Sequence, residues 1–227
     1  MEPYGDSLAR TRREWLKRLL LGGAAVPLLL RHALAAAQRP GGMVKINGEV
    51  LINGRAARIG AMVMPGDHVV TAPGGTAVFV VGQDAFLLRG NSELLTSGSN
   101  VLIASLRLVT GKLLSVFGRG QRRIATPTAT IGIRGTGIYL EVEADRTYAC
   151  TCYGVAELEA SNMPSARETV RTSHHDAPRY IHAQGDMPIK MIEVAPVINH
   201  TDVELIMLEA LVGRVPPFVG SGMEYKY

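Results

Sequence analysis

The stretch Met43-Val44-Lys45-Ile46-Asn47-Gly48-Glu49-Val50-Leu51-Ile52-Asn53-Gly54 decides the fold class of this chain. Two short runs, Val44-Lys45-Ile46 and Val50-Leu51-Ile52, are rich in β-branched residues, and each is followed by Asn-Gly. Asn-Gly supplies the positive φ angles that a type I′ hairpin turn requires, and β-branched residues favour strands. The stretch therefore predicts β-strands that end in tight hairpin turns.

The same pattern continues downstream, where Pro65-Gly66-Asp67 and Pro73-Gly74-Gly75 separate further runs rich in Val, Ile, Leu and Thr. Turn signals recur about every 8–12 residues, the spacing typical of a β-sandwich, barrel or solenoid. We therefore predict an all-β domain over residues 43–160, built of stacked hairpins as a sandwich or a solenoid.

Residues 161–227 are predicted to form a C-terminal extension with short strands and one helix over about 201–212. Thr201 and Glu204 have the spacing of a capping box at the start of that helix, and Gly213 fits its C-terminal end. One apolar stripe is expected to dock on the β-domain. Its residues are Val203, Ile206, Met207, Ala210 and Leu211.

The N-terminal 37 residues have the layout of a secretory signal. Arg12 and Arg13 precede an apolar core at 19–30 and an alanine-rich run at 33–37. The paired arginines resemble a twin-arginine export signal. They predict a periplasmic location, with the twin-arginine export machinery as a partner. The core is shorter than the roughly 20 apolar residues of a membrane-spanning helix, so no permanent span is expected. An uncleaved inner-membrane anchor is the alternative.

The positive charge of the chain belongs largely to this signal. Six of the 24 basic side chains and three of the 20 acidic ones lie in residues 1–35, so the remainder is nearly neutral. A nearly neutral protein gives no electrostatic reason to bind nucleic acid.

Residues 43–145 resemble the FecR domain. The matching elements are Gly48-x-Val50, Asn53-Gly54, Gly60, Pro65-Gly66-Asp67-x-Val69-x-Thr71, Leu108-x-x-Gly111-x-Leu113 and Thr126-Pro127-x-Ala129-x-x-Gly132-x-Arg134-Gly135-Thr136. The last run is the most specific. Pro127 fixes a turn, and Gly135 permits left-handed geometry. The guanidinium of Arg134 is expected to clamp this segment by binding several backbone carbonyls, which we favour over a ligand-binding role.

The resemblance implies a periplasmic module. FecR regulators also need a cytoplasmic anti-sigma segment and a membrane span, and we expect this chain to have neither. We therefore expect a non-catalytic binding or scaffolding protein of the cell envelope, whose partner is an envelope protein or a glycan. The sequence contains no G-x-S-x-G, H-E-x-x-H, phosphate-loop or dinucleotide-binding motif, so no enzymatic activity is predicted.

The two cysteines of the chain, Cys150 and Cys152, are separated by one residue, which places both thiols on one face of a strand. His174, His175 and His200 follow, and a subgroup of FecR-domain proteins is similar in having such Cys-Thr-Cys-Tyr-Gly, His-His and His-Thr-Asp elements.

Three interpretations of this set remain open. Two thiolates and one or two imidazoles suit zinc or copper. An oxidising periplasm could instead close a strained, easily reduced Cys150–Cys152 disulfide that acts as a redox sensor. Alternatively, the cysteines are small buried apolar residues and the histidines lie in a polar loop.

Overall fold

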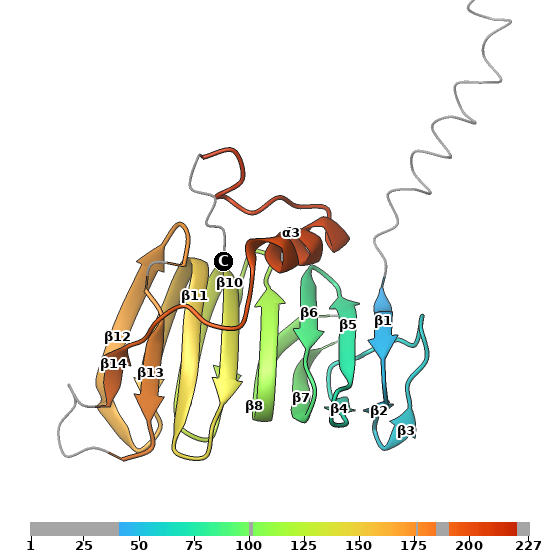
Figure 1. The fold of residues 1–227 in the computed structure, drawn as a ribbon, viewed down its shortest axis with the longest axis horizontal. Coiled ribbons are helices and arrows are strands. Elements are labelled where there is room, and N and C mark those ends of the chain that lie inside the picture. The colour runs from blue at the N-terminus through green and yellow to red at the C-terminus, as the bar shows by residue number, and fades with distance from the viewer. Residues whose placement is uncertain (1–40, 100–101, 176, 185–190, 222–227) are drawn as a thin grey trace, which may run out of the picture. The chain divides into compact units, whose positions relative to one another are not determined.

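The computed structural model describes residues 41–99, 102–175, 177–184 and 191–221. The predicted signal, including Arg12 and Arg13, lies outside these residues. Within them, the chain forms strands joined by tight turns and one short helix near its C-terminal end (Figure 1), which confirms the all-β prediction with a helical extension. The strands are β1 (Gly42–Asn47), β2 (Val50–Ile52), β3 (Arg55–Ala56), β4 (His68–Thr71), β5 (Thr76–Val81), β6 (Asp84–Leu88), β7 (Ser92–Ser99), β8 (Leu102–Val116), β9 (Gln121–Ala125), β10 (Ala129–Val142), β11 (Arg146–Ala160), β12 (Met163–Thr172), β13 (Arg179–His182) and β14 (Ile192–Val194).

The strands form one open sheet that folds over itself as two layers. The long strands β8, β10 and β11 run through both layers. One half of each strand pairs within the first layer, and the other half pairs within the second. The first layer has the order β1-β5-β6-β8-β10-β11-β13-β14. The second has the order β12-β11-β10-β9-β8-β7-β4-β2-β3. Of the two predicted arrangements, this is the sandwich-like one.

Glycines allow the long strands to pass from one layer to the other. The register of β10 against β11 shifts between Arg134 and Gly137, and Gly135 has a φ of 56°. Opposite it, Gly154 has a φ of 93°, and a Cβ there would lie 2.7 Å from the carbonyl oxygen of Gly135. A side chain at residue 154 would therefore block the bend.

Two apolar clusters follow from this arrangement, because alternate side chains of a strand point to opposite faces. The larger cluster lies between the layers and combines residues such as Phe79, Phe86 and Leu140 from the first with Ile131 and Leu158 from the second. The smaller cluster lies on the outer face of the first layer and includes α3. Its largest members are Tyr139, Tyr148, Tyr153 and Phe218, together with Cys150, Cys152, Leu205, Leu208 and Val212.

The opening stretch forms one of the two hairpins that its Asn-Gly pairs predict. Asn53 and Gly54 both have positive φ, 52° and 75°, and Ile52 pairs with Arg55 across them. The first prediction is wrong, because β1 pairs with β5 and belongs to the other layer from β2. At Gly48, a Cβ would lie 3.0 Å from the Cα of Gly75, so this glycine permits close approach between two turns.

Helix α3 (Asp202–Leu211) has the predicted capping box between Thr201 and Glu204. Gly213 follows it with a φ of 69°. The predicted docking stripe is wrong: Val203, Ile206 and Met207 are 73%, 40% and 36% exposed. Ala210 is exposed too, and only Leu211 packs at the margin of the buried cluster.

The opposite face of α3 docks on the sheet through Leu205, Leu208 and Val212. The acidic Glu209 lies within this face, buried, and accepts hydrogen bonds from Tyr153 and Arg214. A buried and satisfied carboxylate breaks the apolar pattern of the docked face, which explains why the sequence favours the wrong stripe.

The sheet continues beyond residue 160 through β12, β13 and β14, and a segment from Ala195 to His200 then leads into α3. Within the described ranges, no helix has the length and apolarity that crossing a bilayer requires.

Candidate metal centre

Cys150 and Cys152 lie on β11, on the outer face of the first layer. Cys150 pairs with Tyr139 of β10 in the centre of that layer. Both thiols are fully buried, and both cysteines are free. The predicted common face is therefore present, and it faces the cluster that α3 covers.

Two histidines reach these thiols from different segments. His175 follows β12 with a φ of 42°, a conformation uncommon for a residue other than glycine. Its backbone N–H donates to the carbonyl oxygen of Cys152 at 3.0 Å, which fixes the loop against β11. His200 directly precedes the N-cap residue Thr201, so the start of α3 determines its position.

The ligand atoms of Cys150, Cys152, His175 and His200 all lie within 4.8 Å of one another. The Sγ of Cys150 lies 3.7 Å from Nδ1 of His175, which lies 2.9 Å from Nε2 of His200. The four residues are at most 3% exposed. Two sulfurs and two imidazole nitrogens are the donors of a closed, tetrahedral zinc site.

The remaining nitrogen of each imidazole contacts a hydrogen-bond acceptor. Nδ1 of His200 lies 2.6 Å from the carbonyl oxygen of Ile198, and Nε2 of His175 lies 3.0 Å from Oδ1 of Asp202. Metal-binding histidines commonly donate their second N–H to a carbonyl or carboxylate in this way. In the neutral tautomers that carry those protons, Nδ1 of His175 and Nε2 of His200 would present lone pairs to each other. A cation among the four ligand atoms would satisfy both, so the donor set fits a metal.

The fifth predicted ligand, His174, lies outside this group of four. Its Nε2 lies 2.7 Å from Oδ1 of Asp202, and its ring packs 4.3 Å from that of Phe218. Oδ1 of Asp202 is thus shared by His174 and His175. Asp202 was not among the predicted site residues. Its place in the His200-Thr201-Asp202 run was the available signal.

The two thiols differ in their tendency to ionise. A hydrogen bond with Cys152 lowers the pKa of Cys150 against the effect of burial, and hydrogen bonds to His175 and His200 lower it further. Burial raises the pKa of the Cys152 thiol, and the neighbouring Cys150 adds to this effect. The site therefore favours one thiolate, and a bound metal ion would favour the second.

The imidazole of His175 responds to the same neighbours. Burial alone would lower its pKa, but hydrogen bonds to Cys150 and Asp202, together with their charges, raise it. Both effects on this pKa have the same origin, because the ring is shielded from solvent and lies beside the potentially anionic Cys150 and Asp202.

The segment that carries His200 is held by buried tyrosines. The ring of His200 stacks on Tyr139, with 4.5 Å between centroids. The hydroxyl of Tyr148 donates to the carbonyl of Pro196 and accepts from the N–H of Ile198. These contacts fix the position of His200 beside the two thiols.

Glu141 also holds this segment, and it gives a pH dependence. Its Oε1 accepts hydrogen bonds from Tyr139 and Asn199 at 2.6 and 2.8 Å. Burial raises the pKa of Glu141, but the hydrogen bonds from Tyr139, Lys112 and Asn199 outweigh it, so the pKa is lowered from 4.5.

The lowered pKa of Glu141 contributes stability that is present above pH 4.5 and lost as the pH falls through the folded-state value. We expect Glu141→Gln to remove part of the acid-side fall in melting temperature, measured from neutral pH to below 4.5. An unchanged profile would contradict this role.

The predicted motif from Thr126 to Thr136 is structural, but not through Arg134. The side chain of Arg134 is exposed and donates no hydrogen bond to any residue in the described ranges, so the predicted clamp is wrong. The guanidinium points outward because Ile133 takes the inward position on β10. The buried hydroxyl of Thr136 pins the crossing instead, accepting from the N–H of Arg134 and donating to the carbonyl of Val155.

The other members of this motif lie around the turn between β9 and β10. Pro127 is in that turn, and the Thr126 hydroxyl accepts from the N–H of Ala129. Thr126 and Thr128 both hydrogen bond to the buried hydroxyl of Thr147 at 2.7 Å.

Variants of Thr136 and of Arg134 test which of the two residues stabilises this segment. We expect Thr136→Val to lower the free energy of unfolding by about 1–3 kcal/mol, because the partly buried N–H groups of Arg134 and Val155 both lose an acceptor. Arg134→Ala is the matched control and should change it by less than about 0.5 kcal/mol. Urea denaturation of both variants checks the prediction, and a larger loss in Arg134→Ala would restore the clamp.

No protein-family model and no curated protein sequence matches this chain. Among solved structures, it is similar to two crystal structures described as a "putative anti-sigma factor" from Parabacteroides distasonis ATCC 8503. Each match has 10% sequence identity and a TM-score of 0.46, and it covers 62% of this chain and 71% of the other. A similarity at this level carries no argument about function.

Proposed function

We propose that this chain is a non-catalytic binding or scaffolding protein that carries a structural zinc ion bound by Cys150, Cys152, His175 and His200. The observation that carries the proposal is the convergence of these four ligand atoms, all within 4.8 Å of one another, from three separate segments. A bound zinc ion would tie β11, the loop after β12 and the start of α3 together.

Zinc is the metal that this site suits best. Structural zinc sites use four protein ligands and leave no coordination position for a substrate, whereas catalytic sites keep one open. Here all four ligands are buried at 3% exposure or less, and α3 and Phe218 belong to the cluster around them. Copper(I) shares the preference for sulfur and is the competing metal.

Metal analysis of the purified full chain tests this proposal. We expect about one zinc ion per wild-type chain, as four protein ligands complete one tetrahedral shell. The Cys150→Ser/Cys152→Ser variant should contain almost none. His68→Gln is the matched control, because His68 is a partly exposed histidine that pairs with Glu93 outside the site. Equal zinc content in all three proteins would remove the site, and copper in place of zinc would change the metal assigned.

A redox role is the second candidate, and the lowered pKa of Cys150 favours it. A thiolate beside a second thiol can be oxidised to a disulfide by a thiol–disulfide exchange partner. Thiol titration of purified protein distinguishes the two functions. Two thiols that become reactive only after chelation support zinc binding, and a disulfide in the purified protein supports the redox role.

The place of action is part of the proposal. The FecR-like elements and the paired Arg12 and Arg13 support an exported protein that binds an envelope protein or a glycan in the periplasm. We expect Arg12→Lys/Arg13→Lys to retain the protein in the cytoplasm. Fractionation of cells that express both forms measures this, and periplasmic accumulation of the variant would contradict twin-arginine export.

A further inference from the structure

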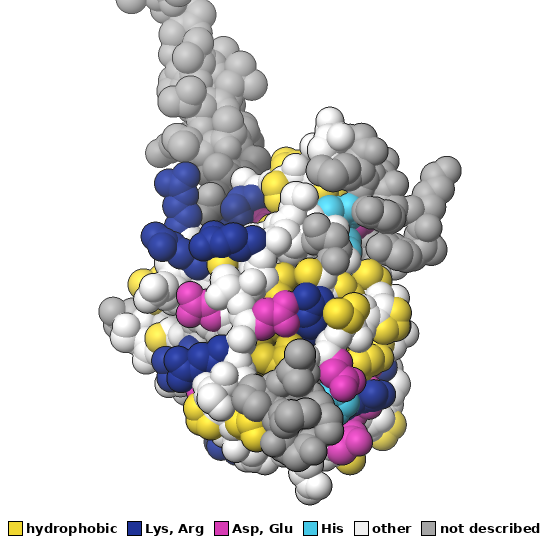
Figure 2. All heavy atoms as spheres, turned by 90° about the vertical axis from the view of Figure 1, so that its left-hand side faces the viewer, with side chains coloured by type: hydrophobic (Ala, Val, Ile, Leu, Met, Phe, Trp, Pro, Cys, Tyr) yellow, Lys and Arg dark blue, Asp and Glu magenta, His cyan; other side chains and the backbone are white. Residues whose placement is uncertain are grey.

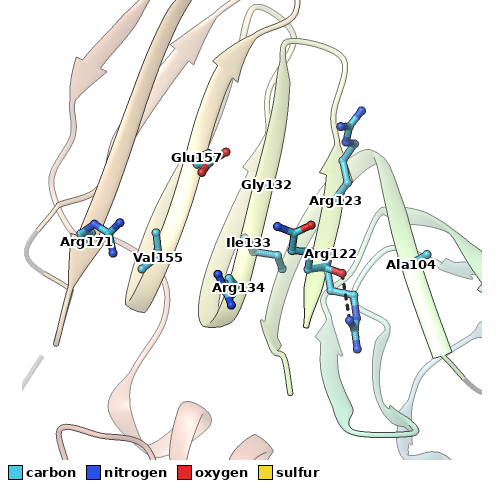
Figure 3. A pocket seen from close by; sticks show the side chains of 10 residues that line it. Ala104, Arg122, Arg123, Gly132, Ile133, Arg134, Val155, Glu157 and Arg171 are labelled. Carbon is cyan, nitrogen blue, oxygen red and sulfur yellow. Dashed lines mark hydrogen bonds between the residues drawn. The ribbon is translucent and has the colours of Figure 1, made fainter. Parts of the chain in front are cut away.

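The outer face of the second layer carries a hollow of about 380 Å³ that is lined by residues of β8 to β12. In one cross-strand row, Arg134 of β10 and Arg171 of β12 flank Val155 of β11. In the next row, Arg123 of β9 and Glu157 of β11 flank Gly132 of β10. Figure 3 shows both rows, with Val155 and Gly132 between the charged side chains.

The strand register explains the hollow. Residues that pair across neighbouring strands share a face, so long side chains on the outer strands rise around the short ones between them. Gly132 has no side chain, and a Cβ there would meet Glu157 only at an ordinary 3.7 Å. The space above Gly132 is therefore not required by the packing of the fold, and a ligand could occupy it.

Three guanidiniums in this hollow have no carboxylate partner in the described part of the chain. Arg123, Arg134 and Arg171 form no ion pair and no side-chain hydrogen bond there, and all three are exposed. The neighbouring acids Glu159 and Glu168 already pair with Arg167 and Arg179. Arg122 also lines the hollow, but it already pairs with Asp84 at 3.1 Å.

The hollow therefore has an excess of positive charge that the fold does not balance, with Glu157 as its one unpaired carboxylate among the described lining residues. Seen from the β12–β14 side, Lys and Arg side chains gather at the left of Figure 2. Three like charges held close together by a sheet repel each other, which favours a bound counter-charge.

We propose that this hollow is a binding site for a small polyanion, a molecule that carries phosphate or carboxylate groups with at least two negative charges. The planar fork of an arginine binds either group through two parallel hydrogen bonds. The volume lies in the range of small-molecule sites. Glu157 disfavours anions that fill the whole hollow, and it can accept a hydrogen bond from a donor group of the ligand.

Calorimetric titration of the full chain with pyrophosphate and with citrate tests the site and distinguishes phosphate from carboxylate ligands. We expect Arg134→Ala, Arg171→Ala and Arg123→Ala each to weaken binding roughly 5- to 10-fold, and their combination to abolish it. Arg58→Ala removes an exposed charge outside the hollow and should leave the affinity unchanged. Glu157→Gln should tighten binding roughly 3-fold, because it removes a like charge.

Failure of this site can be separated from failure of the zinc site. The Cys150→Ser/Cys152→Ser variant should bind the anion normally if it folds, and zinc content should stay constant across the arginine variants. Melting temperatures of the arginine variants exclude unfolding, since exposed substitutions are expected to be nearly neutral. The proposal is overturned if neither anion binds wild-type protein, or if the triple variant and Arg58→Ala bind it equally well.

Discussion

Chelation of zinc is expected to lower the melting temperature of this protein by roughly 8–16 °C. A ligand present at 1,000 times its dissociation constant stabilises the folded state by about 4 kcal/mol, and each kcal/mol shifts the melting temperature of a chain of this size by about 2–4 °C. Zinc should act on the whole fold because its proposed ligands lie on β11, after β12 and before α3. Differential scanning calorimetry with and without a chelator measures the shift.

The control for this experiment is the variant that lacks both thiols. In Cys150→Ser/Cys152→Ser, the chelator should leave the melting temperature unchanged. When zinc is added back, only the wild-type protein should regain its original melting temperature. If the chelator lowers both melting temperatures equally, zinc stabilises the protein at another place. If it lowers neither, the four residues do not bind a structural metal.

Asp202→Asn is expected to reduce the zinc affinity 10- to 100-fold, although Asp202 is not one of the four ligands. Its carboxylate accepts from Nε2 of His175, orients the ring and makes Nδ1 a better ligand. The amide keeps the size of the side chain but loses the negative charge. Competition with a chromogenic zinc chelator measures the change.

Glu204→Gln is the matched control, because Glu204 is the other acidic residue in the first turn of α3. Both substitutions remove one negative charge from the start of the helix, where such charges are favourable. Only Asp202→Asn should alter zinc affinity. Equal losses in both variants would show that the charge at the start of α3, and not the hydrogen bond to His175, determines the affinity.

The fold class could be predicted from local sequence, because turn chemistry acts within a few residues. Asn53-Gly54 and the Thr201–Glu204 capping box formed as predicted for this reason. The pairing of β1 with β5 could not be predicted, since it depends on contacts between distant segments. The docked face of α3 was missed because buried Glu209 finds its partners only in the folded protein.

The candidate site was predictable in its chemistry and only partly in its geometry. A strand places alternate residues on one face, so the sequence was enough to bring Cys150 and Cys152 together. It could not show that His175 faces the thiols while the adjacent His174 turns to Asp202 and Phe218, since that depends on the left-handed backbone of His175. Arg134 was misassigned because the sequence alone does not say which side of β10 faces the core.

The passage of β8, β10 and β11 through both layers has a consequence for how the protein denatures. Neither layer can lose its strands while the other keeps a complete set, so the folded region should melt in a single all-or-none step. Calorimetric and van't Hoff enthalpies should then agree. A destabilising substitution near the thiols and one on the arginine-rich face should therefore lower the midpoint of the same unfolding transition.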